Sequence, residues 1–453
     1  MFIPMHVGPT SITKIIAISL FFLSLSFCQV SSETALQLSL EASIHEAIRQ
    51  NPRLDALKQR IKAQQERFKA TSLDKWAKFE ASYRYTWLDQ PPYVKFRDFP
   101  LENRIPFGKD RDVLWSIEFM QPIFTGFAIS TKEALERLGV DLREVEYEIG
   151  RIDLGFYVKQ AYLMVLMARG EVRVAKEQVK ALKSHLKDAK AMFKQGLIAK
   201  NDLLRSEVAF KGALQELERA QGALKTKKAY LKTLLNIQAN TPIVLTDVRE
   251  PDLTFDKSFD QLKAIAQGHR PEIKALMVSI ERAHLYKRLA KSNYFPNVYL
   301  LGRYEQSGDD LLANRNDFKN SHNTIIAVEA TWRFFEWGKT RHEIQESTYK
   351  INELEKQLED LKNNISFQIK EALHLLLVAK RNIATANTAL EQAQEDLRLT
   401  KLQYKERLAS TSDVLDAQHY LTQARQNLLS AKYGYLLAIS KLERAIGQDL
   451  YEY

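Results

Sequence analysis

The chain contains little of what most enzymes and disulfide-bonded proteins are built from. Its 453 residues include a single cysteine, only 16 glycines and only 12 prolines. One cysteine excludes an internal disulfide and a thiolate metal site. Few glycines and prolines favour long, uninterrupted elements. A Gly-rich phosphate loop, an HExxH motif and a nucleophile elbow are all missing, and the nine histidines are scattered. We therefore predict no cofactor, no metal site and no enzymatic activity.

The charge pattern argues against a nucleic-acid partner. Charged residues make up 27% of the chain, and the net charge is +10. Lysine, arginine and glutamate are interleaved along the predicted helices and do not gather into a basic block. Interleaved charge is typical of a solvated helix surface, whereas nucleic-acid binding needs a clustered basic patch. We therefore interpret the net positive charge as that of solvated helix surfaces.

The N-terminus reads as an export signal. Lys14 precedes an apolar run at 15–27, which is too short to span a bilayer, and Val30, Ser31 and Ser32 follow. This pattern predicts a signal peptide over 1–32, cleaved after about Ser32, with a membrane anchor as the alternative. The lone Cys28 is a poor lipidation site because the residue before it is a bulky phenylalanine.

Beyond the signal, no segment has the roughly 18 consecutive apolar residues of a transmembrane helix. An exported chain of this kind is expected either to stay in solution or to cross an outer membrane as β-strands.

The most informative feature is an internal duplication. The segment FKQGLIAKNDLL at 193–204 is echoed by YKERLASTSDVL at 404–415. Asp202 and Asp413 correspond, so the offset is 413 − 202 = 211 residues. A repeat of this size predicts two similar halves side by side and excludes a solenoid of short units. We place a first repeat at 33–240, a connecting segment at 241–260 and a second repeat at 261–453.

Each half is predicted to carry two strands, at about 78–88 and 112–122 and at about 297–306 and 322–333. Residues alternate between an aromatic-rich apolar face and a polar face, as in an outer-membrane barrel. A small sheet packed on a helix is the alternative, but we see no further strands to complete it. The polar-face residues predicted to line a pore are Arg84, Glu118, Arg303 and Glu329.

Four strands cannot close a barrel, and lipid does not tolerate an open sheet edge. Several copies must therefore share one barrel. Two copies give eight strands, whose interior is filled by side chains, whereas three give twelve and leave a channel.

The helices that follow the strands are expected to be very long. No proline interrupts 131–195 or 339–407, so each run of about 65 residues would measure about 100 Å. The final helix carries a coiled-coil seam of alternating large and small residues, namely Leu421, Ala424, Leu428, Ala431, Tyr435, Ala438, Leu442 and Ala445. The fold class is thus mainly α, internally duplicated, with long coiled-coil helices and a four-strand contribution to a shared transmembrane β-barrel.

Taken together, these features resemble the TolC-like outer membrane efflux protein family over nearly the whole mature chain. The resemblance rests on the duplicated order of elements, on the turns QPIFTG at 121–126 and WRFFEWGK at 332–339, on the tip at 193–204, and on the terminal segment 404–447. It implies a homotrimer with a twelve-stranded barrel in outer-membrane lipid and an α-helical barrel in the periplasm. It also implies a periplasmic adaptor, an inner-membrane pump and a passive exit duct.

The resemblance further implies a constriction at the periplasmic tip. Asn201 and Asp202 match the first-half positions, Tyr404 the second-half aromatic, and Asp413 and Asp416 a paired acidic ring. Two interpretations of Asp413 and Asp202 stand side by side, a carboxylate ring that attracts cations and a helix cap.

One position departs from the family example. Ala409 stands where that example has an arginine, so Lys200, Lys405 or Arg407 is expected to replace its contact. Because Arg407 also occupies the position that corresponds to Gly196, the second tip is expected to turn less easily.

The leading functional hypothesis is an outer-membrane exit duct for drug efflux or type I secretion. The alternative is a structural periplasmic coiled coil without a pore. The sequence identifies neither the cargo nor the pump.

Overall fold

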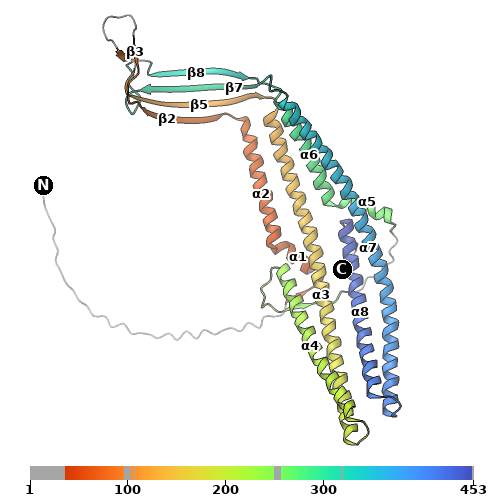
Figure 1. The fold of residues 1–453 in the computed structure, drawn as a ribbon. Coiled ribbons are helices and arrows are strands. Elements are labelled where there is room, and N and C mark those ends of the chain that lie inside the picture. The colour runs from red at the N-terminus through yellow and green to blue at the C-terminus, as the bar shows by residue number, and fades with distance from the viewer. Residues whose placement is uncertain (1–35, 96–103, 107, 249–256, 318–319, 451–453) are drawn as a thin grey trace, which may run out of the picture.

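A computed structural model describes residues 36–95, 104–106, 108–248, 257–317 and 320–450. The predicted signal peptide and Cys28 lie outside these residues. The molecule is elongated, with a β-sheet at one end and long helices that run from it to two hairpin tips at the other (Figure 1). No helix within the described ranges is both long enough and apolar enough to cross a membrane.

The first half begins with β1 (Leu36–Leu38), α1 (Leu40–Gln50), α2 (Pro52–Ser72) and the short 3-10 helix η1 (Leu73–Lys75). Strands β2 (Lys78–Trp87) and β5 (Arg111–Thr125) enclose the small hairpin β3 (Tyr93–Lys95) and β4 (Arg104–Pro106). Helices α3 (Ala128–Lys194) and α4 (Lys200–Leu234) then form the first long hairpin, and β6 (Ile243–Leu245) follows.

The second half repeats this order. It contains α5 (Phe259–His269), α6 (Pro271–Ser292), β7 (Asn297–Gly308), β8 (His322–Thr331), α7 (Lys339–Lys405) and α8 (Thr411–Ile446). Helices α3 and α7 each have 67 residues. The predicted duplication is therefore confirmed in the lengths as well as in the order of the elements.

The helix breaks follow from local chemistry. Asn51 ends α1, and its side chain accepts a hydrogen bond from the Arg53 N–H, so it also caps α2. Pro52 occupies the first position of α2, where its missing N–H costs nothing. Pro271 begins α6 in the same way after α5 ends. Both breaks follow because a proline disfavours helical backbone at the residue before it.

The four-stranded sheet has the order β2-β5-β7-β8, and all its neighbours are antiparallel. The register confirms the predicted faces, since Phe79 lies opposite Phe119, which in turn lies opposite Gly302. The apolar face is open, with Phe79 76% and Ile326 76% exposed. The other face is less uniformly polar than predicted, because Leu114 and Leu301 share it with the charged residues.

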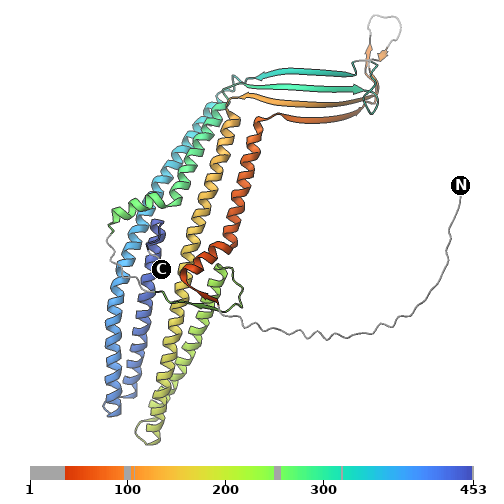
Figure 2. The same ribbon diagram turned by 180° about the vertical axis from the view of Figure 1, so that it is seen from behind.

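The helices continue the order of the strands. Helix α2 contacts α3, α3 contacts α6, and α6 contacts α7, and these four helices adjoin β2, β5, β7 and β8 in turn. Figure 2 shows the resulting wall from the opposite side. Sheet and helices thus form one continuous layer.

Four short strands lie outside the four predicted ones, in two separate two-stranded sheets. Strands β1 and β6 pair in parallel, Leu36 opposite Ile243, and β3 pairs with β4. Each has only three residues, too few to show a period of two. None of them extends the four-stranded sheet, so the reasoning about its open edges is unaffected.

The predicted coiled-coil seam of α8 is buried at six of its eight positions, Leu421, Ala424, Tyr435, Ala438, Leu442 and Ala445. Much of it joins residues of α5, α6 and α7 in one core, while a second core gathers α1, α3, α4, β1 and β6. Each half of the chain therefore supplies most of one core, and Leu163 of α3 joins the core of the second half.

Candidate functional site

The first hairpin tip turns at a glycine. Gly196 has φ +71°, and the N–H groups of Gly196 and Leu197 donate to the carbonyls of Phe193 and Met192 at 2.9 Å each. This pair of bonds is a Schellman motif, which ends a helix through one left-handed residue. Glycine adopts that conformation without a steric penalty.

The second tip makes the same turn without glycine. Arg407 has φ +62°, and the N–H groups of Arg407 and Leu408 donate to the carbonyls of Tyr404 and Gln403 at 3.2 and 2.8 Å. The second tip therefore keeps the same type of turn as the first. The cost expected from the missing glycine falls on Arg407, which adopts the left-handed conformation. A left-handed non-glycine residue costs roughly 1–2 kcal/mol.

Asp413 is engaged by its own helix. Its carboxylate accepts hydrogen bonds from the Ser410 N–H at 2.7 Å and the Ser410 hydroxyl at 2.8 Å, while the Asp413 N–H donates to Ser410 Oγ. The backbone and hydroxyl donors of Ser410 hold the pKa of this carboxyl below its usual value. The predicted cap is thus present, as a capping box that begins α8.

Asp202 occupies the corresponding position of α4 but caps nothing. The N-cap residue of this helix is Ala199, which has no side-chain acceptor. Asp202 is half-buried and neighbouring Asn201 is exposed, with the Asn201 amide oxygen accepting from the Asp202 N–H at 3.0 Å. The carboxylate of Asp202 therefore complements the helix dipole only by its place in the first turn. Asp416, one turn beyond Asp413, is exposed.

Tyr404 lies inside the second hairpin. It is buried, its hydroxyl shares a hydrogen bond of 3.3 Å with the Thr411 hydroxyl, and its ring packs against the His185 ring. These contacts join α7 to α8 and to α3. The sequence offered no signal for His185, because a single histidine in a long helical repeat is usually a surface residue.

The two tips meet through a residue that sequence reasoning missed. Arg205 on α4 donates from Nη1 to Ser412 Oγ on α8 at 2.6 Å. Within the described protomer, the side chains of Lys200, Lys405 and Arg407 make no hydrogen bond or ion pair. Arg205 is therefore the cation that joins the two hairpins at their tips, while Arg425 on α8 pairs with Glu177 on α3 at 2.7 Å farther along the helices.

The predicted pore residues share one face of the sheet, as the register requires. Only two of the four are brought together, since Arg303 Nε lies 3.0 Å from Glu118 Oε1 across the β5–β7 pair. Arg84 lies opposite Leu114, and Glu329 accepts from the Thr331 hydroxyl at 3.2 Å.

A buried ionic cluster joins the halves midway along the helices. Lys159 on α3 donates to Glu443 on α8 at 2.8 Å and to Asp449 at 2.6 Å. Burial lowers the lysine pKa, but the two carboxylates outweigh it and leave the value raised. Close by, Arg444 contacts Asp153 and Glu272 at 2.6 Å each.

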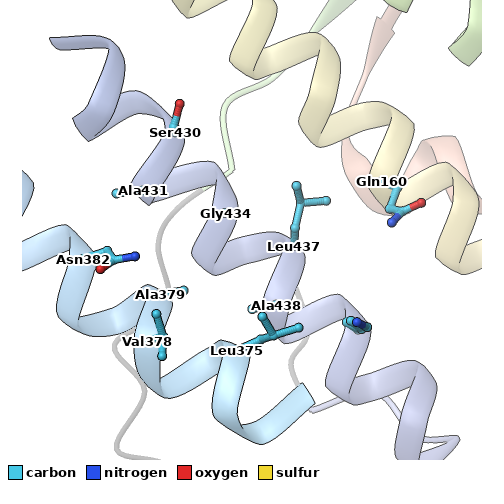
Figure 3. A pocket seen from close by; sticks show the side chains of 11 residues that line it. Gln160, Leu375, Val378, Ala379, Asn382, Ser430, Ala431, Gly434, Leu437 and Ala438 are labelled. Carbon is cyan, nitrogen blue, oxygen red and sulfur yellow. The ribbon is translucent and has the colours of Figure 1, made fainter. Parts of the chain in front are cut away.

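A shallow groove of about 360 Å³ lies between α7 and α8, with Gln160 of α3 at its edge. Figure 3 shows Leu375, Val378 and Ala379 of α7 on one side of the groove. Gly434, Leu437 and Ala438 of α8 lie on the other side. Its mostly apolar and small side chains offer a packing surface and do not combine an acid, a base and a nucleophile.

The comparisons with known proteins agree on one family. Residues 43–236 and 263–448 match the model of the family described as outer membrane efflux protein. The outer membrane protein TolC of Vibrio cholerae is 23% identical over 64% of this chain and 66% of its own length. The alkaline protease secretion protein AprF of Pseudomonas aeruginosa is 21% identical over 75% of this chain and 71% of its own length.

Solved structures show the same fold at lower identity. The structure of CusC superimposes with a TM-score of 0.77 at 17% identity and covers 90% of this chain and 92% of that one. The outer membrane protein VceC of Vibrio cholerae gives a TM-score of 0.74 at 16% identity, covering 91% of this chain and 97% of that one. The predicted fold class is confirmed.

Proposed function

We propose, from the premise that this chain belongs to the outer membrane efflux protein family, that it forms the passive exit duct of a multipartite efflux or type I secretion system. The observation that carries the proposal is the continuous wall, in which four strands with an exposed apolar face pass into four helices in the same order. Such a wall extends a membrane pore into a tube.

The duct is a homotrimer. Strands β2 and β8 are the two edges of the sheet, and an edge in lipid leaves backbone groups unpaired at several kcal/mol each. Pairing β8 of one copy with β2 of the next satisfies both edges. Three copies give twelve strands, and the face with Arg84, Glu118, Arg303 and Glu329 then lines the channel.

The tip is the constriction of this duct. Arg205 replaces the contact that an arginine at position 409 would make, because it links α4 to Ser412 within the protomer. Asp416 supplies the acidic ring, since it is exposed and Asp413 is occupied by its capping box. Asn201, Asp202 and Arg407 are exposed or half-buried at the same end, which leaves them accessible to neighbouring copies in the proposed trimer.

The duct depends on partners for energy. The relatives include proteins named for cation efflux and for protease secretion, so their names cover both small and large cargo. We propose a periplasmic adaptor and an inner-membrane pump as the partners of this chain, with no enzymatic activity of its own. The groove side chains and the tip carry no catalytic set that would argue otherwise.

A planar bilayer tests the proposal. Detergent-extracted protein is expected to form discrete, cation-preferring channels. Asp416→Asn is expected to reduce the cation preference, because three carboxylates at a narrow entrance focus a negative field. Asp413→Asn is the matched control. The preference is expected to change less in it because the Asp413 carboxylate, although charged, is held by the capping box against the positive N-terminal end of α8.

Two other results would contradict parts of the proposal. Channels with the same selectivity in both variants would remove the acidic ring and leave the duct. Protein that is extracted without detergent and gives no channels would instead favour the pore-free periplasmic coiled coil.

A further inference from the structure

We infer that His185 is the residue that positions Tyr404 at the tip, and that protonation of its imidazole releases the tyrosine and loosens the constriction. The inference rests on the proposed function, because it assigns Tyr404 a role in closing the duct. It adds to that function a proton-sensitive residue on α3, outside the segments that carry the family resemblance.

The geometry links three helices through two side chains. The rings of His185 on α3 and Tyr404 on α7 have centroids 5.5 Å apart at an angle of 51°. Each residue is only 8% exposed. On its other side Tyr404 shares a hydrogen bond with Thr411, the first residue of α8. The imidazole therefore holds the tyrosine between the two hairpins.

The imidazole is held in a site suited to its neutral form. Its Nε2 is buried and has no hydrogen-bond partner. Burial, as the largest effect, lowers the pKa of His185; Lys401 on α7 lowers it further, and Asp188 on α3 raises it. The charged group nearby on α4 is Glu207, whose carboxylate pairs with Lys190 of α3 at 3.4 Å and not with the imidazole. Burial of a charged imidazole without a partner is unfavourable.

The direction of the pH effect follows from linkage. The folded tip binds the proton less readily than an exposed histidine, whose pKa is about 6.5. The closed arrangement is therefore fully stable above about pH 6.5 and weakens as the pH falls below it, because only the open arrangement accepts the proton easily. Each unit of pKa difference shifts the opening equilibrium by about tenfold.

The internal duplication does not repeat this pair of residues. Asp396, which is exposed, stands 211 residues after His185, and Phe193, which is 38% exposed, stands 211 residues before Tyr404. The duplicated positions, Asp396 on α7 and Phe193 on α3, therefore hold neither a buried histidine nor a buried tyrosine. Acidification is expected to move α7 and α8 while α3 and α4 stay in place.

The test compares wild type with His185→Phe, which keeps an apolar ring but cannot take a proton, and with His419→Phe, which changes an exposed histidine of α8. Bilayer conductance is recorded between pH 8 and pH 5. Wild type and His419→Phe are expected to open more often below about pH 6.5. The opening frequency of His185→Phe is expected not to change with pH. An unchanged pH response in His185→Phe overturns the inference.

A second readout separates this inference from the proposed duct. Hydrogen exchange of 400–411, corrected for the intrinsic effect of pH, is expected to accelerate in acid in wild type and not in His185→Phe. This holds whether or not channels form, so a duct that fails does not hide the result. Equal acceleration in both overturns the inference. Should the phenylalanine variant lose helical content, His185→Gln replaces it.

Discussion

At the junction of sheet and helix, the first half has Gly126 and Phe127 in the left-handed conformation, with φ +58° and +67°. The second half has Trp337 and Gly338 there, 211 residues later, with φ +52° and +81°. The glycine has changed places with an aromatic residue, yet both pairs keep the same backbone. Two further pairs at the same offset also place a glycine opposite another residue type in the left-handed conformation. They are Gly196 with Arg407 and Asn236 with Gly447.

The difference lies in what surrounds each glycine. A Cβ on Gly126 would lie 2.5 Å from the Ser292 carbonyl oxygen, and one on Gly447 would lie 3.1 Å from that of His269. Around Gly196 and Gly338 there is open space. Crowding therefore makes glycine necessary at two of these corners, while at the others only the backbone angle favours it.

The largest expected contrast concerns Lys159 and Lys370, which are 211 residues apart. Lys159 is buried against Glu443, whereas Lys370 is exposed and lies 5.0 Å from the centre of the Phe259 ring. Lys159→Ala is expected to lower the free energy of unfolding by about 3–5 kcal/mol, because Glu443 stays buried. Lys370→Ala is expected to cost about 1 kcal/mol or less.

Urea midpoints of the two variants in detergent measure this contrast. If the two alanine variants lose the same free energy of unfolding, the buried cluster does not hold the halves together. The double variant Lys159→Met/Glu443→Leu is expected to recover much of the loss, since it removes both charges at similar volume.

A smaller contrast is expected at the junction glycines. Gly126→Ala combines a left-handed alanine with a contact too short for a real Cβ, so we expect a loss of about 2–4 kcal/mol. Gly338→Ala meets no neighbour and is expected to lose about 1–2 kcal/mol. Thermal midpoints of the helical circular dichroism signal rank the two, and the reverse ranking would refute the role given to crowding.

The smallest expected effect concerns the beginnings of α4 and α8. Ser410→Ala removes the cap of α8 and is expected to cost about 1 kcal/mol. Ala199→Ser, 211 residues earlier, places a hydroxyl three residues before Asp202 and is expected to gain up to about 1 kcal/mol by completing a capping box. Hydrogen exchange of the first turn of each helix reports the change. A loss of protection in the Ala199→Ser variant would show that α4 resists capping.

Local rules predicted most of the fold. The Asn51–Pro52 break, the faces of the strands and the capping residue Asp413 all depend on neighbours within a few positions. The contacts between Arg205 and Ser412 and between Lys159 and Glu443 join residues 207 and 284 positions apart. No periodicity links such distant residues, so the cation at the tip and the ionic cluster required the three-dimensional arrangement.

Because α3 and α7 have equal lengths, the two hairpin tips end at about the same level along the molecule. An insertion of seven residues in α3, matched by one in α4 so that the hairpin still closes, would push the first tip about 10 Å beyond the second. Arg205 would then face a different turn of α8, and its bond to Ser412 would be lost. Lineages that lengthen or shorten this tube are therefore expected to change both hairpins together, with matched insertions in α3, α4, α7 and α8.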